Sequence, residues 1–196
     1  MAKIKYTKTE LKAQKDALRR FERFLPMLQL KKQQLQVEIQ SITAAIARVE
    51  AEAEERHASL LPWVRLLAEP VNLPQFLAVE QVVYAEGNIA GVPIPILADV
   101  RFKKSDPDLF LTPSWLDDAL PLLERLIRLR LERETLEEQR RRIAEELRVT
   151  AQRVNLFEKV KIPECRENIR IIRIFLGDEQ TAAVARGKIA KARSAA

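Results

Sequence analysis

Residues 11–49 read LKAQKDALRRFERFLPMLQLKKQQLQVEIQSITAAIARV and carry apolar side chains at alternating steps of three and four residues. With Leu11 at heptad position a, the repeat extends to Trp63, and 13 of its 16 a and d positions are apolar. These positions are Leu11, Gln14, Leu18, Phe21, Leu25, Leu28, Lys32, Leu35, Ile39, Ile42, Ile46, Val49, Ala53, Arg56, Leu60 and Trp63. A seam of this length is typical of a coiled coil and predicts one helix from about Lys8 to Leu61.

The prolines predict a second long helix after a non-helical middle. Seven of the ten prolines lie between Pro62 and Pro113, and helix interiors reject proline at about 3 kcal/mol. We expect the second helix to begin near Ser114 and to end near Ala185. Its seam is Leu122, Leu126, Leu129, Arg133, Leu136, Arg140, Ile143, Leu147, Val154 and Phe157, followed after a slip in phase by Ile162, Cys165, Ile169, Ile172 and Leu176. We interpret the slip as a stutter.

The middle segment predicts a β-hairpin. Val79–Tyr84 is rich in β-branched and aromatic residues, AEGNIAG is a turn signal that includes Gly87 and Asn88, and a second apolar run follows. Pro93 and Pro95 lack N–H groups on the same side of the second strand, which confines that strand to an edge.

The predicted fold is therefore mainly α: a long antiparallel two-helix coiled coil, capped by a small central head that contains the hairpin. We divide the chain into an N-terminal helix (1–61), a central head (62–113, with the hairpin at about 76–102), a C-terminal helix (114–186) and a basic tail (187–196).

The composition argues against catalytic chemistry. The chain of 196 residues holds four glycines, one cysteine and one histidine. The glycines do not form a dinucleotide-binding fingerprint or a P-loop. One histidine and one cysteine are too few for a His/Cys zinc site, and a Cys165–His57 nucleophilic pair has no local support. We therefore expect no catalytic residues, no cofactor, no metal, and no enzyme activity of the chain alone.

The sequence also predicts a cytosolic protein. The N-terminal stretch MAKIKYTKTELK has no apolar signal region, and the longest uncharged run, residues 87–98, is too short for a membrane span of about 20 residues. A lone cysteine fits a reducing compartment. We expect no insertion into a membrane.

Positive charge gathers at the two chain ends. Residues 1–32 carry ten Lys or Arg against three acids, and residues 180–196 carry four basic residues and no acid. An antiparallel hairpin brings these ends together as a basic tip, and we expect about the last 15 residues to extend past the first helix without a partner. We expect residues that lie opposite each other on the two helices to have numbers that add to about 188. Pro26 then lies level with Ile162 and Pro163, which predicts one bend shared by both helices.

Three segments resemble one family. They are KIKYTKTELKAQKDALRRFERFLPMLQLKKQQL (residues 3–35), EGNIAGVPIP (residues 86–95) and RVNLFEKVKIPECRENIRII (residues 153–172). The third is the most specific, since Arg153, Val154, Asn155, Glu158, Ile162 and Pro163 match a family motif, with Phe157 where leucine is usual. Together they resemble the D subunit of the V-type (A-type) ATP synthases, bacterial branch. The short basic ending GKIAKARSAA is a weaker match.

The resemblance implies a non-catalytic central rotor stalk. Its partners would be the catalytic A and B subunits, the F subunit and the membrane-ring connecting subunit (C/d type), and it would be cytoplasmic and peripheral to the cell membrane. Candidate contacts in the A/B ring are Lys3, Lys5, Lys8, Arg186, Lys188 and Lys191. Candidate contacts on the hairpin are Asn88, Ile89, Gly91 and Val92.

Two other interpretations compete with the rotor stalk. A nucleic-acid-binding coiled coil would use a basic patch, but acids interleave along the shaft and aromatic stacking groups are few. A generic coiled-coil scaffold explains the heptads but not the hairpin that interrupts them.

Overall fold

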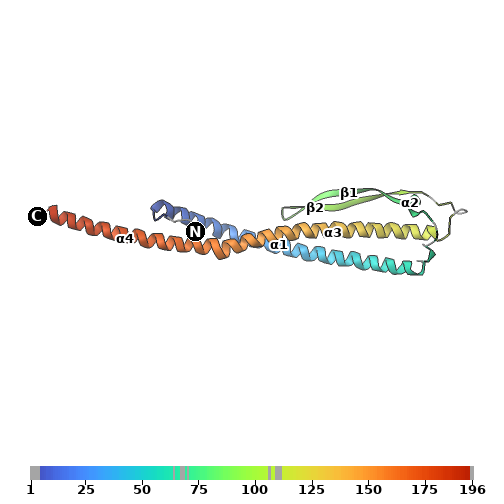
Figure 1. Ribbon diagram of the computed structural model, residues 1–196, viewed down its shortest axis with the longest axis horizontal. Helices are drawn as coiled ribbons and strands as arrows, with labels where there is room; N and C mark the ends of the chain where they lie inside the picture. The colour runs from blue at the N-terminus through green and yellow to red at the C-terminus, as the bar shows by residue number, and fades with distance from the viewer. Residues whose placement is uncertain are drawn as a thin grey trace. The chain divides into compact units, whose positions relative to one another are not determined.

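The computed structural model describes residues 5–63, 65–66, 69, 71–105, 107–108 and 112–194. In chain order the elements are α1 (Lys8–Leu60), the 3₁₀ turn η1 (Leu61–Trp63), α2 (Leu73–Phe76), β1 (Leu77–Ile89), β2 (Val92–Lys104), α3 (Leu116–Leu156), the π-helical turn η3 (Phe157–Lys161) and α4 (Ile162–Ser194). Contacts group the chain into two units, residues 1–32 with 148–196, and residues 33–147. The mainly α fold with a central hairpin is confirmed (Figure 1).

Helix α1 has the predicted start and seam. The backbone N–H of Glu10 donates a hydrogen bond of 3.2 Å to Thr7 Oγ1, which makes Thr7 the N-cap. Each predicted seam position from Leu11 to Ala53 is buried or half-buried, whereas Arg56 is exposed. The side chain of Trp63 lies outside the described residues. Burial of the repeat confirms the coiled-coil interpretation of this helix.

In the 33–147 unit the hairpin lies along the helices instead of capping them. One core joins α1, α3 and β2, and its buried members are Leu35, Ile42, Ile46, Ile143, Val92 and Ile94. Figure 1 shows β1 and β2 running beside α3. The expected cap is therefore wrong. The physical reason is that a two-stranded ribbon cannot bury an apolar face by itself, so it packs on the nearest helices.

The hairpin has a two-residue turn at Ala90 and Gly91. Both residues have positive φ, 51° and 84°, as a type I′ turn requires. The Gly91 N–H donates to Asn88 Oδ1 at 2.9 Å, so Asn88 supports the turn as predicted. Gly87 does not form the turn, because it lies in β1 opposite Ile94. A Cβ at Gly87 would lie 2.6 Å from Ile96 Cδ1, so close packing explains this glycine.

In the terminal unit α1 pairs antiparallel with the C-terminal part of the chain. The rings of Phe21 and Phe157 lie 4.9 Å apart, and those of Tyr6 and Phe175 lie 5.0 Å apart. The numbers in these two pairs add to 178 and 181, whereas those of the ion pair between Arg166 and Glu22, at 2.9 Å, add to the predicted 188. The contacts thus span a range of registers, because apolar periodicity fixes a face and not a register. The common level of Pro26 and Pro163 stays a prediction.

The slip in the second seam coincides with η3. Phe157 and Ile162 are five residues apart in the seam, and the Ile162 N–H bonds to the Phe157 carbonyl, which makes a π-helical turn. Removing one residue there would place Ile162, Cys165 and Ile169 on the same repeat of three and four as Val154 and Phe157. The slip is thus one inserted residue absorbed by a π turn, not the stutter of four that we expected.

The π turn has two candidate causes, the extra residue in the seam and Pro163, which follows the turn directly. Proline lacks an N–H, and its ring clashes with the carbonyl four residues earlier; a π turn relieves this clash. We expect Pro163→Ala alone to keep the π turn, since the seam still steps by five residues. Adding deletion of Lys159 should give a continuous α-helix and raise the melting temperature by a few degrees. Crystal structures and thermal unfolding of both variants check this. Loss of the π turn in Pro163→Ala would assign it to the proline instead.

Candidate partner-binding surfaces

The hairpin tip divides into core residues and exposed residues. Val92, a candidate contact, is 8% exposed and packs in the core of the 33–147 unit. Ile89 is half-buried against the same core. Asn88 and Gly91 are exposed, although the Asn88 side chain accepts the Gly91 N–H. Of the four candidates, Asn88 and Gly91 are the two that a partner could reach without moving the hairpin.

The outer edge of β2 is fastened to α3 by two side chains. Gln139 Nε2 donates to the Pro95 carbonyl at 2.5 Å, and Arg142 Nη1 donates to the Pro93 carbonyl at 3.3 Å. Pro93 and Pro95 carry no N–H, so the edge presents acceptors only, and α3 supplies the donors. The sequence predicted the edge but missed Gln139 and Arg142. Gln139 is 8% exposed, a buried amide that needs this partner.

Carboxylates on α3 hold the basic side chains in place. Glu138 accepts hydrogen bonds of 2.7 Å from both Arg141 and Arg142, and these bonds, Arg141 first, lower its pKa to about 2. Glu138 therefore stays ionised across the physiological range and orients Arg142 toward the hairpin.

At the other end of β2, Lys104 contacts Glu124, and the hydrogen bond from Lys104 is the main cause of the lowered pKa of Glu124. The Arg128 guanidinium lies 4.9 Å from the Phe102 ring centre. Strand β2 is thus tied to α3 near both of its ends.

The basic residues of the chain ends are exposed but not gathered at one level. Lys5, Lys8, Arg186, Lys188 and Lys191 are all exposed. The Tyr6–Phe175 contact marks the end of pairing with α1, and Arg186 lies about 17 Å further along α4. Lys3 lies outside the described residues.

The end of α4 is helical where a tail was expected, and it extends past α1 without a partner, as predicted. The helix continues through Gly187 to Ser194, so a helix end near Ala185 is wrong. Every residue from 177 to 194 is exposed, and Figure 1 shows this part of α4 running on beyond the start of α1. A glycine in an exposed helix costs about 1 kcal/mol and does not end it. The basic end is therefore an unpaired helix.

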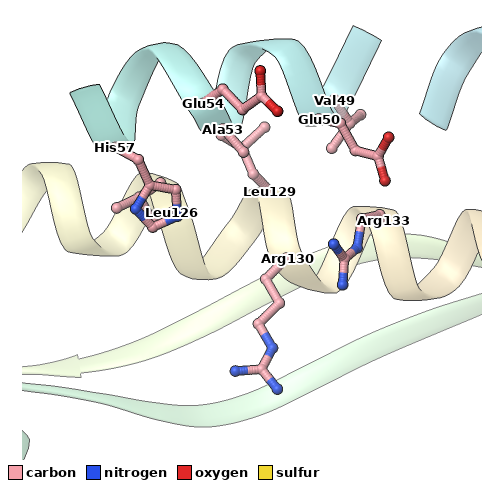
Figure 2. Close-up of a pocket in the computed structure, with 9 residues that line it drawn as sticks. All are labelled: Val49, Glu50, Ala53, Glu54, His57, Leu126, Leu129, Arg130 and Arg133. Atoms are coloured by element: carbon pink, nitrogen blue, oxygen red, sulfur yellow. The ribbon is translucent and has the colours of Figure 1, made fainter. Parts of the chain in front are cut away.

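A groove with a charged rim lies between α1 and α3 in the 33–147 unit. Its apolar lining is Val49, Ala53, Leu126 and Leu129, and its charged or titratable lining is Glu50, Glu54, His57, Arg130 and Arg133. Figure 2 shows the acids and His57 along α1 and the arginines along α3. Arg133, like Arg140, was expected in the seam but is exposed. Side chains of this length carry their charge out to water while the stem lies on the apolar lining.

The described residues hold no group of three His, Cys, Asp or Glu side chains placed to bind a metal ion. Cys165 is buried, and burial raises the pKa of its thiol. Among the helices of the described ranges, none is long and apolar enough to cross a membrane.

Comparison with known proteins places these surfaces in a family. The family of ATP synthase D subunits matches residues 10–192. The chain belongs to this family. The D subunit of the V-type ATP synthase of Borreliella burgdorferi is 44% identical over 191 residues, covering 97% of this chain and 95% of the relative. Subunits of that name from Chlamydia pneumoniae and Chlamydia trachomatis are 31% and 33% identical, covering 96% and 97% of this chain and 91% and 95% of the relatives.

Membership of the D-subunit family confirms the resemblance. The match includes almost all of α1, the hairpin, α3 and almost all of α4, but Lys5 and Lys8 lie before its first residue. The candidate contact residues themselves stay predictions, since sequence similarity over the whole chain does not single them out.

The fastening of the hairpin can be tested at Gln139. Gln139→Leu keeps a side chain of similar size but leaves the Pro95 carbonyl without its donor. We expect the free energy of unfolding to fall by about 1–2 kcal/mol, with faster proteolysis within residues 77–104. Gln152→Leu, at an exposed position of α3, is the matched control. Urea unfolding and limited proteolysis give both readouts, and equal behaviour of the two variants would contradict the fastening.

Proposed function

We propose that this chain is the central rotor-stalk subunit of a V-type or A-type ATP synthase. In this role it couples ATP synthesis or hydrolysis in a ring of catalytic A and B subunits to proton or sodium transport through the membrane sector. The observation that carries the proposal is the family match from residue 10 to residue 192, because it spans both long helices and the hairpin. A coiled coil of this kind suits transmission of torque.

The proposed mechanism is mechanical, and the chain itself breaks no bond. A rotor changes the state of a catalytic site only if it makes different contacts with that site in different orientations. The 33–147 unit supports this requirement, since the hairpin packs on one stretch of its helix pair, at Leu35, Ile42 and Ile46, and the charged groove lies along another, from Val49 to His57. A ring of subunits around such a rod would meet a different surface at each angle.

The proposed partners are the A and B subunits, the F subunit and the membrane-ring connecting subunit. The proposed location is cytoplasmic and peripheral to the membrane, held there through the complex. The unpaired end of α4, with Arg186, Lys188 and Lys191, is proposed to seat in the A/B ring together with Lys3, Lys5 and Lys8. Asn88 and Gly91, with Ile89 and Val92 beneath them, are the proposed contacts of the hairpin.

The bend stays part of the proposal. Pro26 lies inside α1 and Pro163 follows the π turn, both in the terminal unit. Each proline is proposed to bend its own helix, and together they are proposed to give the shaft one shared bend.

Copurification tests the function directly. A tagged copy of the chain, expressed at native level, should elute with A, B and F subunits in a complex that hydrolyses ATP. Depletion of the chain should uncouple hydrolysis from ion transport, and adding it back should restore coupling. A chain that elutes without these subunits, or whose loss leaves coupling intact, contradicts the assignment.

The basic end gives a sharper test. Deleting residues 186–196 should lower assembly with the A/B ring on the order of ten-fold at low salt, and the difference from the wild type should shrink at raised salt, because salt screens the basic end that only the wild type carries. The melting temperature of the free chain should not change, since residues 177–194 are exposed and pack on nothing described. Quantitative pull-down at two salt concentrations measures this.

A matched variant separates charge from length in the same assay. Replacing Arg186, Lys188, Lys191 and Arg193 together by glutamine keeps the helix but removes its charge. If charge seats the helix, this variant should behave like the truncation. Assembly equal to that of the wild type in both variants would remove the basic end from the proposal.

A further inference from the structure

The two edges of the hairpin are protected unequally. Around the two-residue turn Ile89 faces Val92, so in this antiparallel ladder Ile89, Gly87 and Ala85 bond to β2. The intervening residues Asn88 and Glu86 therefore turn their backbone N–H and C=O groups away from β2. Tyr84 continues this set, and together Tyr84, Glu86 and Asn88 form the outer edge of β1.

The opposite edge of the ribbon is closed. Pro93 and Pro95 remove two N–H donors from the outer edge of β2, and Arg142 and Gln139 satisfy their carbonyls. Prolines and a covering helix are two of the ways in which proteins keep sheet edges from pairing with other chains. The outer edge of β2 therefore has no free strand-pairing capacity at these positions.

The outer edge of β1 has none of these protections. Residues 77–89 contain no proline, lysine or arginine, and their register shifts lie at Val79/Gln81 and Val83/Tyr84, before the stretch that leads to the turn. Tyr84 is 53% exposed, and Glu86 and Asn88 are exposed. In the described part of the chain, no backbone group outside the hairpin forms a hydrogen bond with the backbone of these three residues. A regular edge left open in this way is a site for strand addition.

We propose that the outer edge of β1, from Tyr84 to Asn88, binds an extended basic segment of another polypeptide as a third strand. The charge of the edge selects the occupant, because the two charged residues of β1, Glu80 and Glu86, are both acidic. Cross-strand pairs of opposite charge stabilise a sheet, and like charges directly opposite destabilise it. A basic strand would place Lys or Arg beside Glu86, with Tyr84 beside it on the same face.

A second copy of this chain fits the edge less well. Antiparallel pairing of two β1 strands centred on Glu86 would set the two Glu86 side chains opposite each other. Parallel pairing in register would oppose both glutamates with their own copies. The edge is therefore complementary to a basic partner and repels itself, whatever task the larger assembly performs.

Hydrogen exchange tests the added strand in the protein as it exists. The tagged chain is measured alone and in the assembly purified with it. The outward N–H groups of Glu86 and Asn88 should exchange fast in the free chain and about a hundred-fold slower in the assembly. A photo-crosslinking residue at Tyr84 should attach to an extended, basic segment of the partner. Equal exchange in both samples, a chain without any partner, or a cross-link to a helical or acidic segment would overturn the proposal.

Two variants at one position separate strand pairing from surface contact. Glu86→Pro removes the outward N–H but leaves the ladder intact, because residue 86 does not donate to β2. Glu86→Ala removes the charge but keeps the N–H. We expect Glu86→Pro to abolish the slow exchange of the Asn88 N–H and to reduce partner retention about ten-fold, with a smaller loss for Glu86→Ala. Unchanged melting of the free chains shows that both fold.

Equal effects of the two variants would mean that the partner covers the edge without pairing to it, which contradicts strand addition. The concentrated free chain could also show slow exchange at this edge and a dimer by sedimentation. If Glu86→Pro abolished both, the edge would be assigned to a second copy of the chain, which also contradicts the proposal.

Discussion

The apolar seam of α1 is the constraint on which the other elements depend. Leu35, Ile42 and Ile46 are buried by α3 and at the same time by β2, so one row of side chains serves two packing partners. A single helix of this length has no tertiary stability of its own, and its apolar stripe must be covered. In the described part of the terminal unit no strand packs on this stripe, which is covered by the helical segment from residue 148 onward, and its positions there are half-buried instead of buried.

The second seam shows how such a helix pair accepts an irregularity. One residue too many between Phe157 and Ile162 would turn Cys165, Ile169 and Ile172 away from α1. The π turn takes up that residue, and these three side chains remain buried. The helix loses its regular hydrogen bonds over one turn and keeps its apolar face toward α1. This costs less free energy than a misplaced face, which would expose many apolar side chains.

The hairpin makes the 33–147 unit unequal around its axis. Its β2 edge is closed by two prolines and by donors from α3, while its β1 edge stays open. The same ribbon therefore does two things: it buries Val92 and Ile94 in the core, and it presents backbone groups and glutamates outward. An element that stabilises the shaft and also exposes an open edge suits a protein that works inside an assembly.

Periodicity and proline placement were enough to predict two long helices, a hairpin between them and the seam residues from Leu11 to Ala53. These features are local, since they depend on the spacing of side chains along one helix or strand. The three motif segments were enough to identify the family. Register, by contrast, is a relation between distant parts of the chain, so only the tertiary structure decided that Phe21 meets Phe157 and that Arg166 pairs with Glu22. The position of the hairpin against α3 was equally hidden, because Gln139 and Arg142 look like surface residues of a helix until the Pro95 and Pro93 carbonyls are placed beside them.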